Sequence, residues 1–326
     1  MERQPKMETR ITHTKDGTQK TILVTGAAGF IGSFFLDLLM RLHYKVVIVI
    51  SPTSDTWRIK EYLASVSVYY NDLGSLRKLF YENKIDAVFH LATRYYKNHT
   101  STDQVADMIE SNVLFPCVIL DLMREYGVKH IITAGSFFEY DLMGKKILNE
   151  VSPVHPYNFY AQTKLAFQDM VYFYTKSYGL KCVHLRLFAP YGPKDNTKLV
   201  PYIIQRLIKR ESFETTAGEQ QWNFTYVEDI AEAFVKSLEY CNTMKKTYDV
   251  FDIGITQTHT VRTVVESLEE ISGITNLARY NRPYADNEIF FVNCEGQKAK
   301  ELLNWTAHTS LKEGLQKTWN YYSSLK

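Results

Sequence analysis

The chain of 326 residues is 45% hydrophobic and 23% charged, a composition that is typical of globular proteins and excludes disordered or fibrous classes. Its 38 Lys and Arg residues against 36 Asp and Glu residues leave a net charge of +2, so we expect no broad basic surface for nucleic acid or an anionic membrane. The four cysteines are dispersed, without a Cys-x-x-Cys pair. This spacing predicts no metal site and favours a reducing, cytoplasmic setting.

Residues 1–20 are predicted to be a polar tail, because they lack the apolar stretch of a signal peptide and contain acids that transit peptides avoid. After them, apolar runs rich in β-branched residues alternate with helical segments, and none approaches the ~20 residues of a membrane helix. The alternation predicts an α/β fold with a Rossmann-type, doubly wound parallel sheet covered on both faces. The predicted strands are 21–25, 45–50, 66–70, 86–91, 129–134 and 181–188.

Three glycines directly follow the first predicted strand and precede a helical run. The first glycine permits a tight turn, the second lets the backbone approach a pyrophosphate, and the third lets the helix pack close to the sheet. The helix N-terminus then faces the anion. A glycine turn without a ligand is the alternative interpretation. The predicted dinucleotide-binding residues here are Gly26, Gly29, Phe30, Ile31 and Gly32.

The end of the second predicted strand bears on the type of dinucleotide. NAD sites usually place an Asp or Glu there for the ribose 2′-hydroxyl, and that acid would repel the 2′-phosphate of NADP. The chain has no acid from Val49 to Ser54. Ser51, Thr53 and Ser54 can donate hydrogen bonds to a phosphate, and Arg58 can add a positive charge. The segment therefore favours NADP(H) over NAD.

A Tyr followed four residues later by a Lys is a candidate catalytic pair, because both side chains lie on one helix face. The ammonium group favours tyrosinate and lowers the phenol's pKa from ~10, which makes a proton donor usable near neutrality. Spacing alone does not choose among the three such pairs in the chain. They are Tyr160/Lys164, Tyr172/Lys176 and Tyr322/Lys326.

The pattern changes after the sixth predicted strand. Prolines interrupt the chain, helical patterns follow at 199–209 and 228–240, and strands become sparse. We therefore predict a dinucleotide-binding domain over residues 21–188 and a smaller α/β substrate lobe over residues 189–326. A strand near residues 249–253 could return to the main sheet, which leaves this boundary soft.

Position in the chain singles out one Tyr/Lys pair, because the chain resembles the extended short-chain dehydrogenase/reductase (NAD-dependent epimerase/dehydratase) family from about residue 20 to its end. In that family a Ser or Thr stands four residues before a Tyr, and Tyr-x-x-x-Lys follows some two dozen residues later. Ser136 with Tyr140, and Tyr160 with Lys164, match this order. The resemblance implies that Ser136, Tyr160 and Lys164 are catalytic and that Asn112 supports a water that replaces the donated proton.

The resemblance also extends the expected binding site. The stretches 89–92, 186–193 and 224–229 fall where the family has them. Trp222 stands where the family often has an Arg for the substrate diphosphate, so Arg282 is expected to bind that anion. The implied cofactor-binding residues also include Asp72, Leu73, Leu91, Ala92, Tyr160 and Lys164, and the implied substrate-binding residues are Thr93, Phe137, Phe138, Val200 and Arg282.

Within the family, the chain is most similar to the CDP-abequose synthase-like 4-ketoreductases of nucleotide-linked deoxysugars. This similarity implies NADPH-dependent reduction of the 4-keto group of a nucleotide-linked 6-deoxysugar, with CDP as a candidate nucleotide and Tyr160 as the acid. The stretches that carry the similarity are 90–93, 136–138, 200–204, 215–220 and 286–289.

Related activities remain as alternatives. Family 4,6-dehydratases carry an Asp-Glu pair where this chain has Phe137 and Phe138, and phenyl rings cannot move protons, so dehydration is not expected. A 4-epimerase that retains NAD is the main alternative, since it uses the same Ser, Tyr and Lys, and a non-catalytic cofactor-sensing protein is a minor one. The long apolar helices predicted at 103–126 and 157–178 are expected to pair two chains into a homodimer, as related enzymes do.

Overall fold

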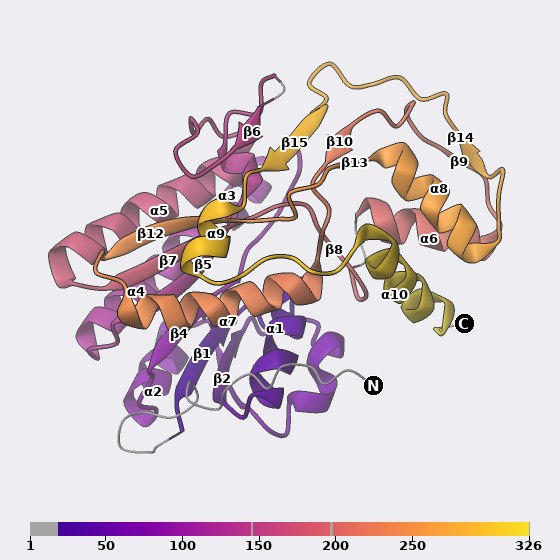
Figure 1. The fold of residues 1–326 in the computed structure, drawn as a ribbon. Helices are drawn as coiled ribbons and strands as arrows, with labels where there is room; N and C mark the ends of the chain where they lie inside the picture. Colours follow the sequence, from indigo (N-terminus) through magenta and orange to yellow (C-terminus); the bar gives the residue numbers. More distant parts are fainter. Residues whose placement is uncertain (1–18, 145, 196–197, 326) are drawn as a thin grey trace.

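The computed structural model describes residues 19–144, 146–195 and 198–325. Its main layer is a seven-stranded sheet in which neighbouring strands run parallel. The strands are β1 (Thr21–Thr25), β2 (Lys45–Ile50), β3 (Ser67–Tyr70), β4 (Ala87–His90), β5 (His130–Ser136), β7 (Lys181–Leu187) and β12 (Tyr248–Ile253). They stand in the order β12-β7-β5-β4-β1-β2-β3 (Figure 1). The predicted α/β class with a Rossmann-type sheet is confirmed.

Long helices cover both faces of this sheet. They are α1 (Phe30–Arg41), α2 (Leu73–Glu82), α4 (Phe115–Glu125), α5 (Phe159–Tyr178) and α7 (Val227–Thr243). Ile22 and Val24 of β1 share an apolar cluster with α1 and α7, whereas Leu23 joins a second cluster with α2, α4 and α5. Because both faces bury apolar side chains, the strand sequence has no polar alternation.

Part of the chain beyond residue 188 belongs to this main sheet. β12 forms its edge beside β7, with Phe251 opposite Leu185. α7 packs beside α1 on one face, and α9 (Gln297–Leu302) packs on β12 (Figure 1). Residues from both sides of position 188 therefore build the sheet layer.

The remaining elements form a smaller lobe at the carboxyl ends of the main strands (Figure 1). Its helices α6 (Leu199–Lys209), α8 (Val261–Ser272) and α10 (Leu311–Ser323) enclose an apolar cluster. A four-stranded sheet of order β13-β10-β15-β6 stands beside them. The short strands are β6 (Ile147–Leu148), β10 (Gln221–Trp222), β13 (His259–Thr260), β15 (Phe291–Cys294), and the pairs β8 (Pro190–Tyr191) with β11 (Thr225–Tyr226) and β9 (Phe213–Glu214) with β14 (Ala278–Arg279).

The helix predicted over residues 103–126 is interrupted. It consists of α3 (Thr102–Ile109), a π-helical turn η3 (Glu110–Leu114) and α4. Pro116 occupies the first turn of α4, and proline has no N–H to continue an i to i−4 ladder. The wider turn places Asn112 inside the protein, which the sequence pattern did not indicate.

Across the described ranges of the chain, we find no helix long and apolar enough to cross a bilayer.

The turn between β1 and α1 leaves no room for side chains at its third glycine. A Cβ atom on Gly32 would lie 2.0 Å from the carbonyl oxygen of Gly26 and 3.0 Å from the Cα of Ala27. Both neighbours are backbone atoms, so they cannot rotate away. The third glycine is thus required for α1 to start against the sheet.

We predict that Gly32→Ala lowers the free energy of unfolding by more than ~2 kcal/mol, because overpacking a fixed backbone costs about this much or more. Urea unfolding followed by circular dichroism measures the change. Gly74→Ala is the matched control, since a Cβ there meets only the Asp72 side chain, at 3.3 Å. Equal stability of the two variants would contradict the steric argument.

Candidate functional site

A cleft of about 1850 Å³ is lined by residues from the carboxyl ends of the main strands and by residues of the smaller lobe. In parallel sheets this edge is the usual ligand site. Of the residues predicted from sequence, Thr53, Asp72 and Asn112 do not line the cleft. Those that do are Gly26, Gly29, Phe30, Ile31, Gly32, Ser51, Ser54, Arg58, Leu73, Leu91, Ala92, Thr93, Ser136, Phe137, Phe138, Tyr160, Lys164, Val200 and Arg282.

The glycine turn fits a dinucleotide. Gly26 has φ +75°, and a Cβ there would lie 2.4 Å from the amide nitrogen of Ala92 at the end of β4. The Gly29 amide donates to the Gly26 carbonyl at 3.0 Å. No side chain caps the N-terminus of α1, and its first residues Phe30, Ile31 and Gly32 line the cleft. A helix N-terminus of this kind suits a pyrophosphate. The close packing of this turn on the backbone after β4, together with its place on the cleft wall, is the observation that supports a nicotinamide dinucleotide here.

Short polar side chains organise the end of β2. Ser54 Oγ accepts from the Ser51 amide at 3.0 Å, and the Ser51 and Thr53 hydroxyls are 3.0 Å apart. The Arg58 Nε donates to the Lys194 carbonyl at 2.9 Å. Arg58 therefore joins the β2 end to a loop of the smaller lobe while its side chain lines the cleft.

Asp55 is an acid on the cleft wall that the sequence analysis did not weigh. It follows Ser54, the last residue of the predicted phosphate-binding segment. Its Oδ1 accepts from the Trp57 amide at 3.1 Å. Trp57 begins the 3-10 turn η2 (Trp57–Tyr62), and the guanidinium of Arg58 lies over its ring. The carboxylate is a candidate partner for a ribose hydroxyl, a function that the family places at this end of β2.

Two predicted residues lie beside the cleft in structural roles. Asp72 caps α2, its Oδ1 accepting from the Ser75 amide at 2.9 Å. Such a cap satisfies an amide that the helix itself cannot. The Thr53 hydroxyl lies within hydrogen-bond distance of the Ser51 hydroxyl. Their neighbour Leu73 does line the cleft.

Tyr160 and Lys164 lie on the first turns of α5, which begins at the cap Asn158. The Lys164 Nζ is 5.7 Å from the centre of the Tyr160 ring, and the Tyr95 ring meets that ring edge-on at 4.8 Å. Both side chains of the pair are buried, Tyr160 being 9% and Lys164 3% exposed. Tyr172, Lys176 and Tyr322 of the other pairs do not line the cleft, and Lys326 lies outside the described residues.

Burial dominates the ionisation of this pair. It raises the pKa of Tyr160 above its ordinary value, the charge of Glu139 raises it further, and a hydrogen bond with Thr93 opposes the rise. It also lowers the pKa of Lys164 to about 8, against the opposing charge of Glu139. The pKa of Tyr160 is thus raised overall, because desolvation of the phenol is the largest contribution. The lowering contribution expected from Lys164 stays a prediction.

Ser136 stands at the end of β5 and caps the 3-10 turn η4 (Phe137–Glu139). Its Oγ accepts from the Phe138 amide at 3.2 Å, and its own amide donates to Glu139 Oε1 at 2.9 Å. This reciprocal pair is a capping box. It fixes the hydroxyl at the cleft wall across from α5.

Asn112 is held by four hydrogen bonds within the protein. Its Oδ1 accepts from the Thr93 hydroxyl at 3.1 Å and the Arg94 amide at 2.7 Å. Its Nδ2 donates to the Arg94 carbonyl and to Thr163 Oγ1, both at 2.9 Å. The amide thus ties the loop after β4 to α5 and has no bond left for a water.

Aromatic rings form the wall beside Ser136. The Phe137 ring contacts those of Phe188 and Trp222, with both centroid distances 5.7 Å, and Phe138 stacks on Tyr157 at 5.4 Å. The Trp222 indole donates to the Ile289 carbonyl at 2.9 Å. We name Phe137, Phe138 and Trp222, which line the cleft, the aromatic wall; Tyr157 supports the Phe138 ring from outside the lining. Trp222 thus contributes an aromatic surface where the sequence indicates only that an arginine is missing.

The smaller lobe supplies the far end of the cleft. Val200 and Arg282 line it as predicted, and the Arg282 amide donates to the Thr215 carbonyl at 3.1 Å. Cations that the sequence analysis left out also line the cleft. They are Arg94, Lys97 and Lys198.

Metal ligands do not gather in this cleft. Within the described residues, no cluster of three or more His, Cys, Asp or Glu side chains could hold a metal ion.

Comparison with known proteins agrees with this geometry. The chain is 28% identical over 315 residues to a UDP-glucuronate 4-epimerase of Thermodesulfobacterium geofontis, covering 92% of this chain and 95% of the relative. It is 24% identical over 302 residues to the CDP-abequose synthase of Salmonella muenchen, covering 91% and 96%. The crystal structure of a UDP-glucuronic acid 4-epimerase from Bacillus cereus, in complex with UDP-glucuronic acid and NAD, superposes with a TM-score of 0.80 at 25% identity, covering 94% and 100%.

The parallel sheet and its glycine turn at the strand ends place this chain among the Rossmann-type enzymes that use a nicotinamide dinucleotide. The sequence pattern of the NAD dependent epimerase/dehydratase family matches residues 22–254. The chain belongs to that family.

Proposed function

We propose that this chain is an NADPH-dependent reductase of the 4-keto group of a nucleotide-linked 6-deoxysugar, with CDP as the first nucleotide to test. Its relatives support a nucleotide-sugar substrate, because a UDP-sugar epimerase and a CDP-sugar synthase both match over nearly the whole chain. The observation that carries the choice of reaction is a buried Tyr160 that lines the same cleft as Ser136, where phenyl rings follow the serine instead of carboxylates. Burial raises the pKa of Tyr160, which favours its protonated form. A protonated phenol is the form that ketone reduction needs.

Each residue of the site has a defined task in this proposal. When bound, the nicotinamide supplies the hydride. Tyr160 donates its proton to the oxygen at sugar carbon 4, and the Ser136 hydroxyl donates a hydrogen bond to the same oxygen. Lys164 holds positive charge next to the phenol and stabilises the tyrosinate that the transfer leaves behind. Asn112 positions the loop of Thr93 against α5, and this replaces the water-binding task expected from sequence.

The aromatic wall favours a substrate with an apolar group at carbon 6. Phe137 and Phe138 line the cleft beside Ser136. A 6-methyl group would gain free energy on leaving water for such a surface, whereas a carboxylate would be left there without a partner. The wall also lacks a proton carrier, so 4,6-dehydration stays outside the proposal.

A 4-epimerase that retains NAD is the second candidate. Asp55 on the cleft wall favours it, since a carboxylate at the β2 end suits a free ribose 2′-hydroxyl. The absence of an acid from Val49 to Ser54 weighs against it, because an acid at the end of the second strand is what NAD sites usually carry. A non-catalytic cofactor-sensing protein is the least supported reading, given that Ser136, Tyr160 and Lys164 all reach one cleft.

The test of this function is a coupled assay. CDP-, dTDP- and GDP-linked 4-keto-6-deoxysugars are generated by their own 4,6-dehydratases, and oxidation of NADPH and NADH is followed at the absorbance of the reduced nicotinamide. The proposal expects oxidation of NADPH with at least one of these sugars. Conversion of a UDP-sugar to its 4-epimer without added cofactor, with NAD co-purifying, would replace the proposal with the epimerase.

We predict that Tyr160→Phe lowers kcat at least as much as Ser136→Ala. Acid catalysis is worth ~10²- to 10⁴-fold, and one hydrogen-bond donor at a developing oxyanion ~10²- to 10³-fold. Steady-state kinetics of both variants give the order. Tyr172→Phe is the control, since Tyr172 lies half-exposed on the same helix away from the cleft. A larger loss for Ser136→Ala than for Tyr160→Phe would contradict the acid assignment.

The preference for NADP(H) is a separate prediction. Ser51→Asp should lower kcat/KM for NADPH by roughly 10- to 100-fold relative to NADH, because a carboxylate there repels the 2′-phosphate. Asp55→Asn should leave the NADPH/NADH ratio nearly unchanged if Asp55 only holds the turn of Trp57, because the Asn oxygen can accept the same bond from the Trp57 amide. A wild-type preference for NADH that Asp55→Asn abolishes would show instead that Asp55 binds the ribose.

The homodimer expected from sequence also remains a proposal. Apolar side chains that are 42–59% exposed lie along α3, η3 and α5. Light scattering should give twice the mass of one chain, and Phe173→Glu should give single chains, because burying a charge in an interface is costly. Tyr81→Glu, on α2, is the control. Single chains for the wild type would contradict the proposal. The exposed residues are Ile109, Leu114, Met170, Phe173 and Tyr178.

A further inference from the structure

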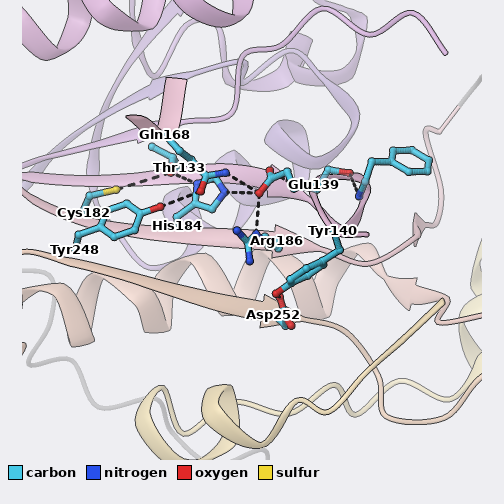
Figure 2. Close-up of polar contacts among 11 residues, drawn as sticks. Thr133, Glu139, Tyr140, Gln168, Cys182, His184, Arg186, Tyr248 and Asp252 are labelled. Carbon is cyan, nitrogen blue, oxygen red and sulfur yellow. Dashed lines mark hydrogen bonds and ion pairs between the residues drawn. The ribbon is translucent and has the colours of Figure 1, made fainter. Parts of the chain in front are cut away.

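A buried acid stands directly behind the candidate site. Glu139 ends the turn that starts at Ser136, is 0% exposed and does not line the cleft. It directly follows Phe137 and Phe138, the two positions at which family dehydratases carry their acids. Its side chain, however, points into the protein (Figure 2). It therefore cannot touch the substrate, and a task in proton transfer is excluded by its position.

Four groups donate hydrogen bonds to the Glu139 carboxylate or lie against it (Figure 2). The Ser136 amide donates to Oε1 at 2.9 Å. Gln168 Nε2 donates to Oε2 at 2.6 Å, Arg186 Nε donates to Oε2 at 2.8 Å, and His184 Nε2 lies 3.3 Å from Oε2. Burial raises the pKa of this carboxyl, but the bonds from His184 and Arg186 outweigh it and lower the pKa to about 2. The group is thus a fixed negative charge.

These partners come from the elements that carry the catalytic candidates. Ser136 ends β5, whereas Gln168 lies on α5, one turn after Lys164 and two turns after Tyr160. The Tyr248 hydroxyl of β12 donates to Gln168 Oε1 at 3.0 Å and holds that amide in place. Backbone packs closely over the group, since a Cβ on Gly135 would lie 2.6 Å from Glu139 Oε1.

We infer that Glu139 is a positioning residue that locks Ser136 to the helix of Tyr160 and Lys164, and so sets both the geometry and the charge of the site. The inference rests on the proposed reductase reaction. One carboxylate bonds the backbone of the serine and the side chain of the helix, so the distance between the Ser136 and Tyr160 hydroxyls depends on it. A carboxylate fixed by four partners in a dry interior also acts on nearby charges with little screening.

The charge of Glu139 acts on both members of the Tyr/Lys pair. It raises the pKa of Lys164 against burial and adds to the rise at Tyr160. The other titratable groups that face the pair are Tyr95, His90 and His184. Burial lowers the pKa of both histidines, that of His90 to about 3, so near neutrality Glu139 supplies the negative charge.

The experiment compares two substitutions that separate charge from linkage. Glu139→Gln keeps the shape and removes the charge, whereas Gln168→Met keeps the charge and removes the bond to α5. For each variant we measure kcat and KM for the nucleotide sugar from pH 6 to 10, with thermal unfolding as the folding check. Asp249→Asn is the control, because Asp249 is a buried carboxylate paired with Lys298 away from the cleft.

Wild-type kcat should fall as pH rises through about 8, because Lys164 is charged below its pKa and neutral above it. In Glu139→Gln, kcat should fall at a pH about one unit lower than in the wild type, because the charge that raises the Lys164 pKa is gone. We call this fall of kcat at high pH the alkaline limb. Both variants should lose roughly 10- to 100-fold in kcat at pH 7 with KM little changed, since small displacements of reacting groups cost this much. Gln168→Met should keep the wild-type limb.

Two further outcomes decide the matter. Should Glu139→Gln fail to fold, Glu139→Asp keeps the charge with a shorter reach, and the inference expects it to lose kcat while keeping the wild-type limb. The inference would be overturned if Glu139→Gln lowered the melting temperature and kcat but left unchanged the pH above which kcat falls. Glu139 would then have only a structural role. If the chain proves to be an epimerase, its kcat should fall at low pH, and in Glu139→Gln this fall should still move to lower pH. Failure of the proposed function is therefore distinguishable from failure of this inference.

Discussion

Parallel pairing of the main strands is the constraint on which the candidate site depends. Because β1, β4, β5 and β7 run in the same direction, each must be followed by a crossover, and all of their carboxyl ends meet at one edge. The glycine turn follows β1, Thr93 follows β4, and Ser136 ends β5. Residues far apart in the chain thus reach one cleft without any special local arrangement. The smaller lobe closes the same edge, and β12 and α7 return from it to the sheet.

Burial, which stabilises this layer, also sets its chemistry. The desolvation that accompanies close packing of α5 on the sheet raises the pKa of Tyr160 and lowers that of Lys164. A phenol in this environment keeps its proton until a negative charge develops next to it, which suits an acid better than a base. Glu139 contributes to the same balance from behind the cleft. Phe137 and Phe138, which line the cleft beside Ser136, carry no titratable group, so the proposal assigns the proton to the phenol of Tyr160.

Sequence patterns predicted the fold class and the parts of the site that depend on local geometry. Gly26 and Gly32 were identifiable because only glycine fits the close backbone contacts that the turn needs. Tyr160 and Lys164 were identifiable by their spacing together with their order after Ser136. The strands were identifiable as apolar runs without polar alternation, which indicate burial on both faces of a sheet. Each of these signals lies within a short stretch of sequence.

The features that sequence missed depend on contacts between distant segments. The link from Glu139 to Gln168 and Arg186 joins three elements, and no local pattern distinguishes that glutamate from an exposed one. The four bonds of Asn112 required the π-helical turn. Asp55 lines the cleft because of the path that the chain takes after the end of β2. In each case tertiary packing decides which atoms a side chain meets.

The central claim is that hydride passes irreversibly from NADPH to sugar carbon 4, and isotope transfer tests it most directly. NADPH deuterated at carbon 4 of the nicotinamide, prepared separately on each face, is incubated with the enzyme and a nucleotide-linked 4-keto-6-deoxysugar. The product is then examined by mass spectrometry and NMR. The account predicts one deuterium at sugar carbon 4 from one of the two labelled faces, with one NADP⁺ formed per product. An epimerised nucleotide sugar that carries no deuterium, formed while the added NADPH stays unoxidised, would contradict it.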